Sequence, residues 1–114
     1  MGTSDLTLLV ERMPVFEEKT GVSLTGISVF LDRDDDFEYM SLSVRGELQA
    51  VKEDSAKDDF SIKIVVYDKN DRVIGNSNIS FDLEDFFGFD VFSEWLDIPA
   101  AEIGNIRIFP KKGY

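Results

Sequence analysis

Apolar and polar residues alternate over residues 60–81, and this pattern predicts two β-strands joined by a short turn. Four apolar residues share one face of an extended chain, namely Phe60, Ile62, Ile64 and Val66. Period-two spacing is typical of a strand with one side against a hydrophobic core. Residues 68–71 then read Asp-Lys-Asn-Asp, and Asn or Asp tolerates the left-handed backbone conformation that such turns need. We therefore predict a β-hairpin.

The second strand of this hairpin contains two small residues. Val73, Ile79 and Phe81 fall on one face of it, with Gly75 and Ser77 between them. Small residues inside a strand mark a bulge or a close approach of another backbone. We expect one of these at Gly75 and Ser77.

Two segments before the hairpin also have strand patterns. Residues 39–50 contain the longest alternation in the chain, which predicts a central strand with one solvated face. In residues 22–31 the apolar positions change phase between Leu24 and Ile27. A change of phase by one residue indicates a β-bulge, which we place at Thr25 and Gly26.

The two ends of the chain have weaker patterns. Residues 5–13 fit neither a helix nor a strand, and Pro14 is expected to end whatever they form. We expect residues 1–14 to be a loosely packed segment. Pro99 is expected to begin a single helical turn through Glu102, before a last strand at residues 105–109.

An aromatic run lies between residues 82 and 97. Its large rings are Phe86, Phe87, Phe89, Phe92 and Trp95. Helical spacing would align the first, third and fourth of these rings, so a helix is an alternative. We favour a strand, because Gly88 and the density of aromatic and β-branched residues disfavour a helix.

A strand in this run would carry rings on both faces, whereas a two-layer sandwich buries only one face of each strand. At least one ring should then be exposed, covered by the N-terminal segment, or buried in a partner. We name Phe86, Phe92 and Trp95 as candidate partner-binding residues. The alternative is that residues 6–13 or a bulge at Gly88 absorb the rings into the core.

These elements together predict an all-β fold. Six to seven strands at about ten-residue spacing, with no long helical pattern between them, are typical of an antiparallel two-layer β-sandwich. The 114 residues fit one domain with one core, and a hydrophobic content of 43% argues against disorder. We therefore expect residues 1–114 to form a single sandwich domain.

Charge and composition exclude several classes of function. The formal net charge is −11, from 23 acidic and 12 basic residues, and such a field repels nucleic acid and anionic lipid surfaces. The chain has no histidine and no cysteine, so disulfides and thiolate metal sites are excluded. No membrane-spanning segment or signal peptide is recognised. An envelope or secreted location would follow if a signal had been removed, and neither compartment nor oligomeric state is predicted.

Part of the hairpin resembles a known family. Residues 64–68 read Ile-Val-Val-Tyr-Asp and residues 72–75 read Arg-Val-Ile-Gly. This resembles the signature of bacterial FxLYD-type domains, in which a strand ends in Tyr-Asp and a turn leads to a strand carrying Val-Ile-Gly. Tyr67, Asp68 and Gly75 match, whereas Ile64 and Val66 replace the Phe and the Leu of the signature. Asp71 also stands where the turn often has Gly, and the resemblance covers at most residues 43–92.

The resemblance implies an immunoglobulin-like sandwich that serves as a non-catalytic module in bacterial envelope or secreted proteins. On physical grounds, we expect Tyr67 to cover an edge of the core. Asp68 is expected to cap the turn by accepting backbone N–H groups.

Calcium is the most specific ligand that the sequence suggests, because hard cations need clustered oxygen ligands. The candidate ligands lie in two acidic segments: Asp32, Asp34 and Asp36 in one, and Asp68, Asn70 and Asp71 in the other. The second segment is not an EF-hand, because Arg72 is at its fifth position and Val73 stands where Gly is required. Two converging loops would be needed to form the site.

Catalysis has little support in the sequence. Without histidine or cysteine, an enzyme would need paired carboxylates or an activated serine or lysine. The pairs Asp58-Asp59 and Glu84-Asp85 place neighbouring side chains on opposite sides of an extended chain. A carboxylate-dependent hydrolase is the third reading, and we expect no enzyme.

The sequence therefore favours a non-catalytic binding or accessory module without a cofactor. A protein partner would contact it through the aromatic segment or through a sheet edge. The alternative is a calcium-binding or calcium-stabilised sandwich.

Overall fold

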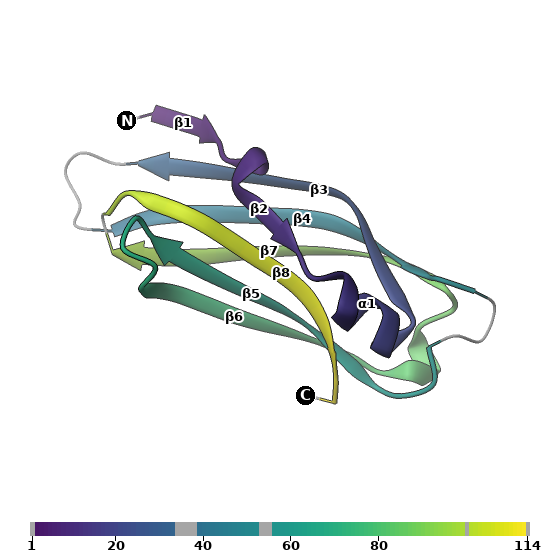
Figure 1. The fold of residues 1–114 in the computed structure, drawn as a ribbon. Coiled ribbons are helices and arrows are strands. Elements are labelled where there is room, and N and C mark those ends of the chain that lie inside the picture. Colours follow the sequence, from purple (N-terminus) through teal and green to yellow (C-terminus); the bar gives the residue numbers. More distant parts are fainter. Residues whose placement is uncertain (1, 34–38, 53–55, 100, 114) are drawn as a thin grey trace.

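The computed structural model describes residues 2–33, 39–52, 56–99 and 101–113, and these form two sheets packed face to face (Figure 1). One sheet has the order β1-β3-β4-β7 and the other the order β2-β8-β5-β6. The strands are β1 (Gly2–Asp5), β2 (Val10–Arg12), β3 (Val22–Arg33), β4 (Tyr39–Ala50), β5 (Phe60–Asp68), β6 (Val73–Phe81), β7 (Phe89–Pro99) and β8 (Ile103–Lys112). The helical elements are α1 (Pro14–Thr20) and two 3₁₀ turns, Thr7–Leu9 and Leu83–Asp85. The sandwich measures 47 × 24 × 22 Å.

The hydrophobic core lies between the two sheets. Alternating residues of β4 and β5 point into it and are almost fully buried: Met40, Leu42, Val44 and Leu48 from β4, and Phe60, Ile62, Ile64 and Val66 from β5. The same spacing in β3, β7 and β8 completes one continuous cluster. The predicted β-sandwich is thus confirmed, because the central strands β4 and β5 each bury one face at period two against the other sheet.

The predicted hairpin is β5 and β6, which pair in an antiparallel register. Its turn follows the expected chemistry. Asp68 accepts the backbone N–H groups of Asn70 and Arg72 at 2.8 and 3.0 Å, and Asp71 has a φ of +62°. The register shifts between Val66 and Tyr67, at the end of the strand.

Gly75 is needed on β6 because the other sheet approaches it closely. A Cβ at this position would lie 2.6 Å from Cγ2 of Ile98 on β7.

The predicted bulge at Thr25 and Gly26 is also present. The register between β3 and β4 shifts between Thr25 and Ser28, and Gly26 has a φ of +58°.

The N-terminal segment is more integrated than the sequence predicted. Instead of packing loosely, it gives one strand to each sheet: β1 pairs with β3, and β2 pairs in parallel with β8. Leu6, Leu9 and Val10 pack against the core. The change of sheet at the 3₁₀ turn explains why residues 5–13 had no single period.

Helix α1 was not predicted, because Pro14 was taken only as a stop. Pro14 is instead at the start of the helix, where its missing N–H costs nothing, and Gly21 ends the helix with a φ of +75°. Within the described residues, no helix is long enough and apolar enough to cross a lipid bilayer.

Two further details differ from the sequence predictions. The described residues contain eight strands rather than six to seven, because β1 and β2 were not anticipated. The helical turn expected from Pro99 to Glu102 does not form in the described part of that segment. Pro99 is the last residue of β7, and residues 101 and 102 have no regular structure.

The strand order bears on the immunoglobulin-like expectation. Here β3 pairs with β4 and β5 pairs with β6, so consecutive strands form hairpins within each sheet. An immunoglobulin sandwich places its second strand beside its fifth and its third beside its sixth. Here β4 also pairs with β7, and β5 also pairs with β8, so these two pairings recur when the strands are counted from β3.

Candidate binding surface

Strand β7 separates its large side chains between two faces. Phe92, Leu96 and Ile98 point into the core and are at most 6% exposed. Phe89, Val91 and Trp95 point to solvent and are 56%, 60% and 57% exposed. Phe87, just before the strand, is 89% exposed and continues the same alternation. The aromatic run is thus a strand with apolar residues on both faces, as the sequence predicted.

Two of the three candidate partner-binding residues belong to the core, which corrects the sequence reading. Phe86 packs edge-on against Phe60, with ring centroids 5.2 Å apart. Phe92 lies so close to Gly46 that a Cβ there would be 2.6 Å from its Cε1. Neither ring offers surface to a partner. The third candidate, Trp95, is exposed. Phe87, Phe89 and Trp95 share one phase of the alternation, and this phase in the sequence could have identified the exposed rings.

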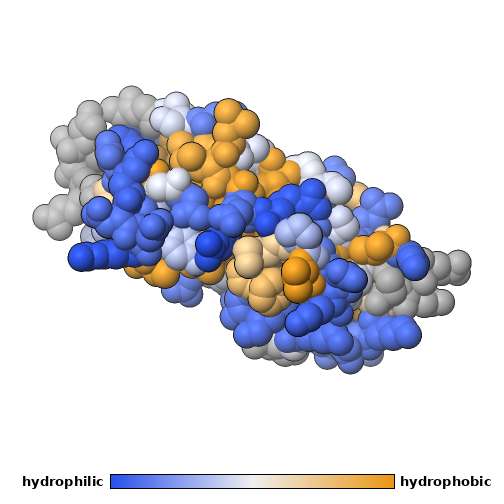
Figure 2. All heavy atoms as spheres, in the orientation of Figure 1, coloured by the Kyte–Doolittle hydropathy of each residue, from blue (hydrophilic) through white to orange (hydrophobic). Residues whose placement is uncertain are grey.

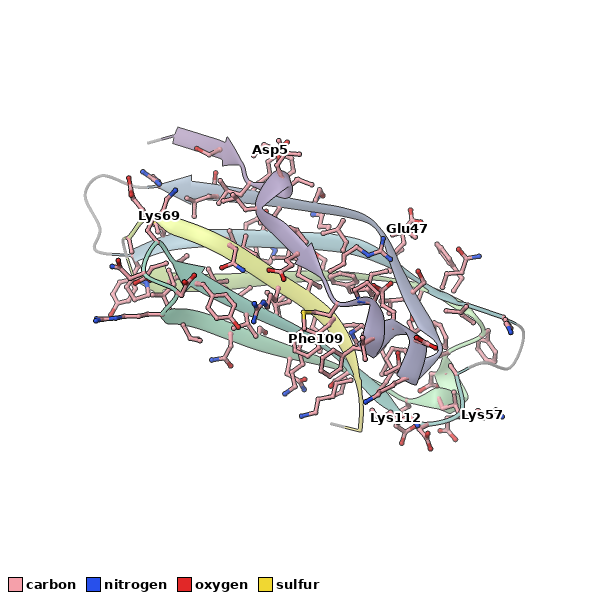
Figure 3. The ribbon with its side chains drawn as sticks, in the orientation of Figure 1. Asp5, Glu47, Lys57, Lys69, Phe109 and Lys112 are labelled. Atoms are coloured by element: carbon pink, nitrogen blue, oxygen red, sulfur yellow. The ribbon has the colours of Figure 1, made fainter. Side chains whose placement is uncertain are left out.

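The exposed residues of β7 lie next to polar residues of β4. In the antiparallel register, Phe89 is opposite Gln49, Val91 opposite Glu47, Ser93 opposite Arg45, Trp95 opposite Ser43, and Asp97 opposite Ser41. We call this surface the β7 face: Phe87, Phe89, Val91, Ser93, Trp95 and Asp97, with Arg45, Glu47 and Gln49 of β4. Glu47 points away from the core (Figure 3), and its carboxylate leans over Gly26 of β3.

The β7 face continues at both ends of its apolar row. Ser43 is opposite both Trp95 and Phe30 of β3, and it is only 8% exposed although its neighbours are partly open to solvent. At the other end, Phe87 and Gly88 line a shallow pocket together with Gln49. Apolar surface therefore extends beyond a single strand.

The β7 edge, in contrast, is partly closed by its own carboxylates. Gly88 accepts the N–H of Ala50 at 2.8 Å, so the odd-numbered residues of β7 direct their N–H groups away from β4. Asp90 accepts the N–H of Val91 at 2.8 Å, and Glu94 accepts the N–H of Trp95 at 3.2 Å.

The second oxygen of Glu94 also has a partner. It accepts the hydroxyl of Ser77 on β6, at 2.7 Å, which links the edges of the two sheets. A partner strand would have to displace these contacts to pair with β7.

The opposite side of the molecule is mainly hydrophilic. Over β8, β5 and β6 most residues are hydrophilic, and apolar residues gather near the N-terminal 3₁₀ turn and beside α1 (Figure 2). On this side Arg107 lies over the ring of Tyr67, at 5.1 Å from its centroid, and donates to its hydroxyl at 3.4 Å. The Tyr67 hydrogen bond, and then the Glu11 carboxylate, raise the pKa of Arg107. Tyr67 therefore packs on the outer face of its sheet rather than over a core edge.

A small basic pocket lies beside α1. It is lined by Phe16, Lys19, Thr20, Lys111 and Lys112, and the ring of Phe16 packs at a tilt against Phe109, with ring centroids 4.7 Å apart. Phe109 and Lys112 both come from β8 (Figure 3). Structural roles account for two of the lysines: Lys112 pairs with Asp58 at 3.5 Å, and Lys19 lies in the last turn of α1, where the helix dipole favours a cation.

The calcium candidates are only partly described. Asp34 and Asp36 lie outside the described residues. Among the others, Asp32 accepts the Thr3 hydroxyl at 2.6 Å, and Asp68 caps the β5–β6 turn. Within the described ranges, no three acidic side chains gather closely enough to hold a metal ion.

Of the two acidic pairs considered for catalysis, one makes a structural contact with the segment of the other. Asp59 accepts the N–H of Leu83 at 2.8 Å, which ties the start of β5 to the 3₁₀ turn after β6. Glu84 and Asp85 lie exposed in that turn. The Asp59 contact therefore holds the backbone of this turn in place.

Comparison with known proteins gives little to add to this geometry. No family model matches the chain, and no curated protein matches it. One similar solved structure is named "putative beta-galactosidase from bacteroides fragilis". It has a TM-score of 0.48 and 11% sequence identity, over 81% of this chain and 16% of that one.

Proposed function

We propose that the protein is a non-catalytic binding module and that its contact surface is the β7 face. The observation that carries the proposal is the exposure of Phe89, Val91 and Trp95 on one side of β7, and of Phe87 just before it, each more than half open to solvent. Contiguous large apolar side chains on a surface, rimmed by polar residues, mark interaction sites. Aromatic residues also supply much of the binding energy at protein interfaces.

A partner is more readily bound by the β7 face than by strand pairing along the β7 edge. Pairing of a partner strand with β7 would need the N–H groups of Val91 and Trp95, which Asp90 and Glu94 already occupy. The outward side chains have no such competitor. A partner can therefore cover Trp95 and Val91 without breaking a hydrogen bond of the free protein.

We further propose that the β5–β6 hairpin is FxLYD-like in its local construction. Support comes from Asp68, whose carboxylate caps the turn, and from Gly75, whose missing side chain admits Ile98. Support for an immunoglobulin-like sandwich comes from the pairing of β4 with β7 and of β5 with β8, which are the second–fifth and third–sixth pairs of that fold when β3 is counted first. Membership of that family would be tested by detecting the same Tyr-Asp turn in homologous chains.

A photo-crosslinking experiment tests the proposed surface. Benzoylphenylalanine replaces Val91 in one variant and Val73 in a control variant, since Val73 is similarly exposed at 56% but belongs to β6. Both proteins are expressed in the native host and irradiated. We expect the variant at position 91 to give a reproducible adduct with one protein, identified by mass spectrometry.

The adduct must also depend on the apolar face. Adding Trp95→Ser to the variant at position 91 should abolish it, because this removes the largest exposed ring of the surface. Equal labelling at positions 73 and 91, or labelling that survives Trp95→Ser, would contradict the proposal.

A further inference from the structure

The chain segment that contains β7 has charged side chains of one sign only. Residues 73–106 contain seven carboxylates and no lysine or arginine, so all 12 basic residues lie elsewhere. This stretch includes β6 and β7, which are the outermost strands of their sheets and contact each other. Neither strand has a lysine or arginine, and β7 carries the carboxylates of Asp90, Glu94 and Asp97.

We propose that the partner of the β7 face is a basic protein segment in which lysine or arginine alternates with apolar residues. This inference rests on the proposed function above. Acidic residues flank the exposed rings on the face itself: Asp97 follows Trp95 by two positions, and Glu47 is opposite Val91. A cation on the Trp95 ring would also lie near the Asp97 side chain, since alternate residues of a strand are about 6.7 Å apart.

Charge argues against a second copy of this chain as the occupant. Two β7 faces in contact would bring together Glu47 and Asp97 of each copy, and each copy has a net charge of −11. Like charges placed opposite one another destabilise an interface. The same field attracts a basic partner and increases its rate of encounter.

Arg45 determines which kind of partner residue fits at one position of the β7 face. Among the described residues of the face it is the one base, and it lies opposite Ser93, between the rows of Val91 and Trp95. An acidic or neutral polar residue of the partner would fit there, with basic residues on either side. The partner segment thus has an expected pattern as well as an expected charge.

The probe for this inference is a fluorescein-labelled peptide, acetyl-Lys-Leu-Lys-Thr-Lys-Leu-Lys-amide. Binding to the wild-type protein is followed by fluorescence anisotropy. Its charge-reversed counterpart, with glutamate at each lysine position, is the first control. We expect the basic peptide to bind and the acidic peptide not to bind. The Kd should increase about tenfold between about 20 mM and about 300 mM salt, because added ions screen exposed charges.

Two double variants separate the face from the general field of the protein. Glu47→Gln/Asp97→Asn removes two charges from the face, whereas Glu18→Gln/Asp71→Asn removes two exposed charges elsewhere. Both leave the same net charge. We expect the first to weaken peptide binding at least about threefold more than the second, since nearby charges interact more strongly than screened distant ones.

Trp95→Ser and Val91→Ser test the apolar part of the same surface. Each should weaken binding, while Val73→Ser should not, and circular dichroism confirms that each variant is folded. A basic peptide that does not bind, or that binds equally to both charge variants, overturns the basic partner. If the Kd is also unchanged in Trp95→Ser and Val91→Ser, the peptide does not bind at the β7 face.

The crosslinking experiment tests the β7 face as a binding surface independently of the charge of the partner. An adduct at position 91 with an acidic or neutral protein would retain the face as a binding surface and reject the basic partner. Binding of the peptide that is lost in both the charge and the apolar variants supports both statements.

Discussion

At the scale of single residues, Glu17 supplies β3 with a hydrogen-bond acceptor that a neighbouring strand would otherwise provide. Its side chain is 8% exposed, and Oε1 accepts the backbone N–H of Leu24 at 2.9 Å. Arg12 of β2 forms an ion pair with the same carboxylate. One acidic residue of α1 therefore satisfies an edge donor of one sheet and holds a strand of the other.

We expect Glu17→Ala to lower the free energy of unfolding by about 1–3 kcal/mol, because a buried N–H loses its acceptor. Arg12 is half exposed and can be hydrated, so the lost ion pair adds little. Glu17→Gln, which keeps an acceptor for Leu24, should cost less. Urea unfolding of the three proteins measures both effects, and equal midpoints would refute this role.

Gly75 of β6 leaves room for the side chain of Ile98 of β7. In Gly75→Ala the new methyl would meet Cγ2 of Ile98 at 2.6 Å. Such overpacking typically costs about 1–3 kcal/mol. Ile98→Val added to Gly75→Ala should recover part of the loss if a different side-chain conformation relieves the contact. Thermal melts would show it, and an undiminished stability of Gly75→Ala alone would argue against the close approach.

At the scale of elements, β7 has one structural face and one face that is free to bind. Phe92 belongs to the first and Trp95 to the second, although they are three residues apart in the same aromatic run. Their roles follow from strand phase and not from chemical type. This separation makes binding and stability independently testable.

Phe92→Ala is expected to lower the free energy of unfolding by about 3–5 kcal/mol, the usual cost of a cavity left by a buried ring. Trp95→Ser should change it by no more than about 1 kcal/mol, because exposed substitutions have small effects. Chemical denaturation with the two single variants measures both values. A large loss in Trp95→Ser would mean that the ring is part of the packing and would weaken the proposed surface.

The carboxylates along the β7 edge lead to a second prediction for this element. Natural sheets protect their edges with charged side chains, and Asp90 and Glu94 do so by occupying the N–H groups of Val91 and Trp95. Asp90→Ala/Glu94→Ala should therefore promote self-association. Sedimentation velocity at rising protein concentration detects it.

The control for this prediction is Glu84→Ala/Asp85→Ala, which removes the same charge from the 3₁₀ turn before β7. If both double variants associate equally, reduced repulsion between copies is the cause. The edge would then need no protection from these two carboxylates.

At the scale of the whole molecule, the acidic residues serve different purposes in different places. Some hold the backbone of the sandwich, such as Asp68 in the β5–β6 turn and Asp59 beside the 3₁₀ turn. Others cover the β7 edge or surround the β7 face. Within the described residues, the carboxylates are therefore distributed over turns, edge and surface.

These contacts lead to a prediction about calcium. The Asp68 carboxylate already accepts two backbone N–H groups, and Asp32 accepts the Thr3 hydroxyl, so calcium would have to compete with both. We expect melting temperatures in about 1 mM calcium and in chelator to coincide, because a ligand stabilises the native state only if it binds it. A higher midpoint with calcium would favour the calcium-stabilised sandwich instead.

Much of the fold follows from local pattern. The alternation in residues 39–50 and 60–81 specified β4, β5 and β6, and Asn or Asp in residues 68–71 specified the turn. The phase change at Thr25 and Gly26 specified the bulge of β3. Each of these signals depends on neighbours in sequence, so the residues alone were sufficient to predict them.

The remaining features depended on contacts between distant segments. No local pattern showed that residues 2–12 would divide between two sheets, or that Glu17 would be buried against Leu24. For the binding surface, the sequence by itself determined that rings lie on both faces of residues 86–95. Only the packing of the second sheet against β7 decided that Phe92 is covered and that Phe89, Val91 and Trp95 are not, because burial of a strand face depends on what lies opposite it.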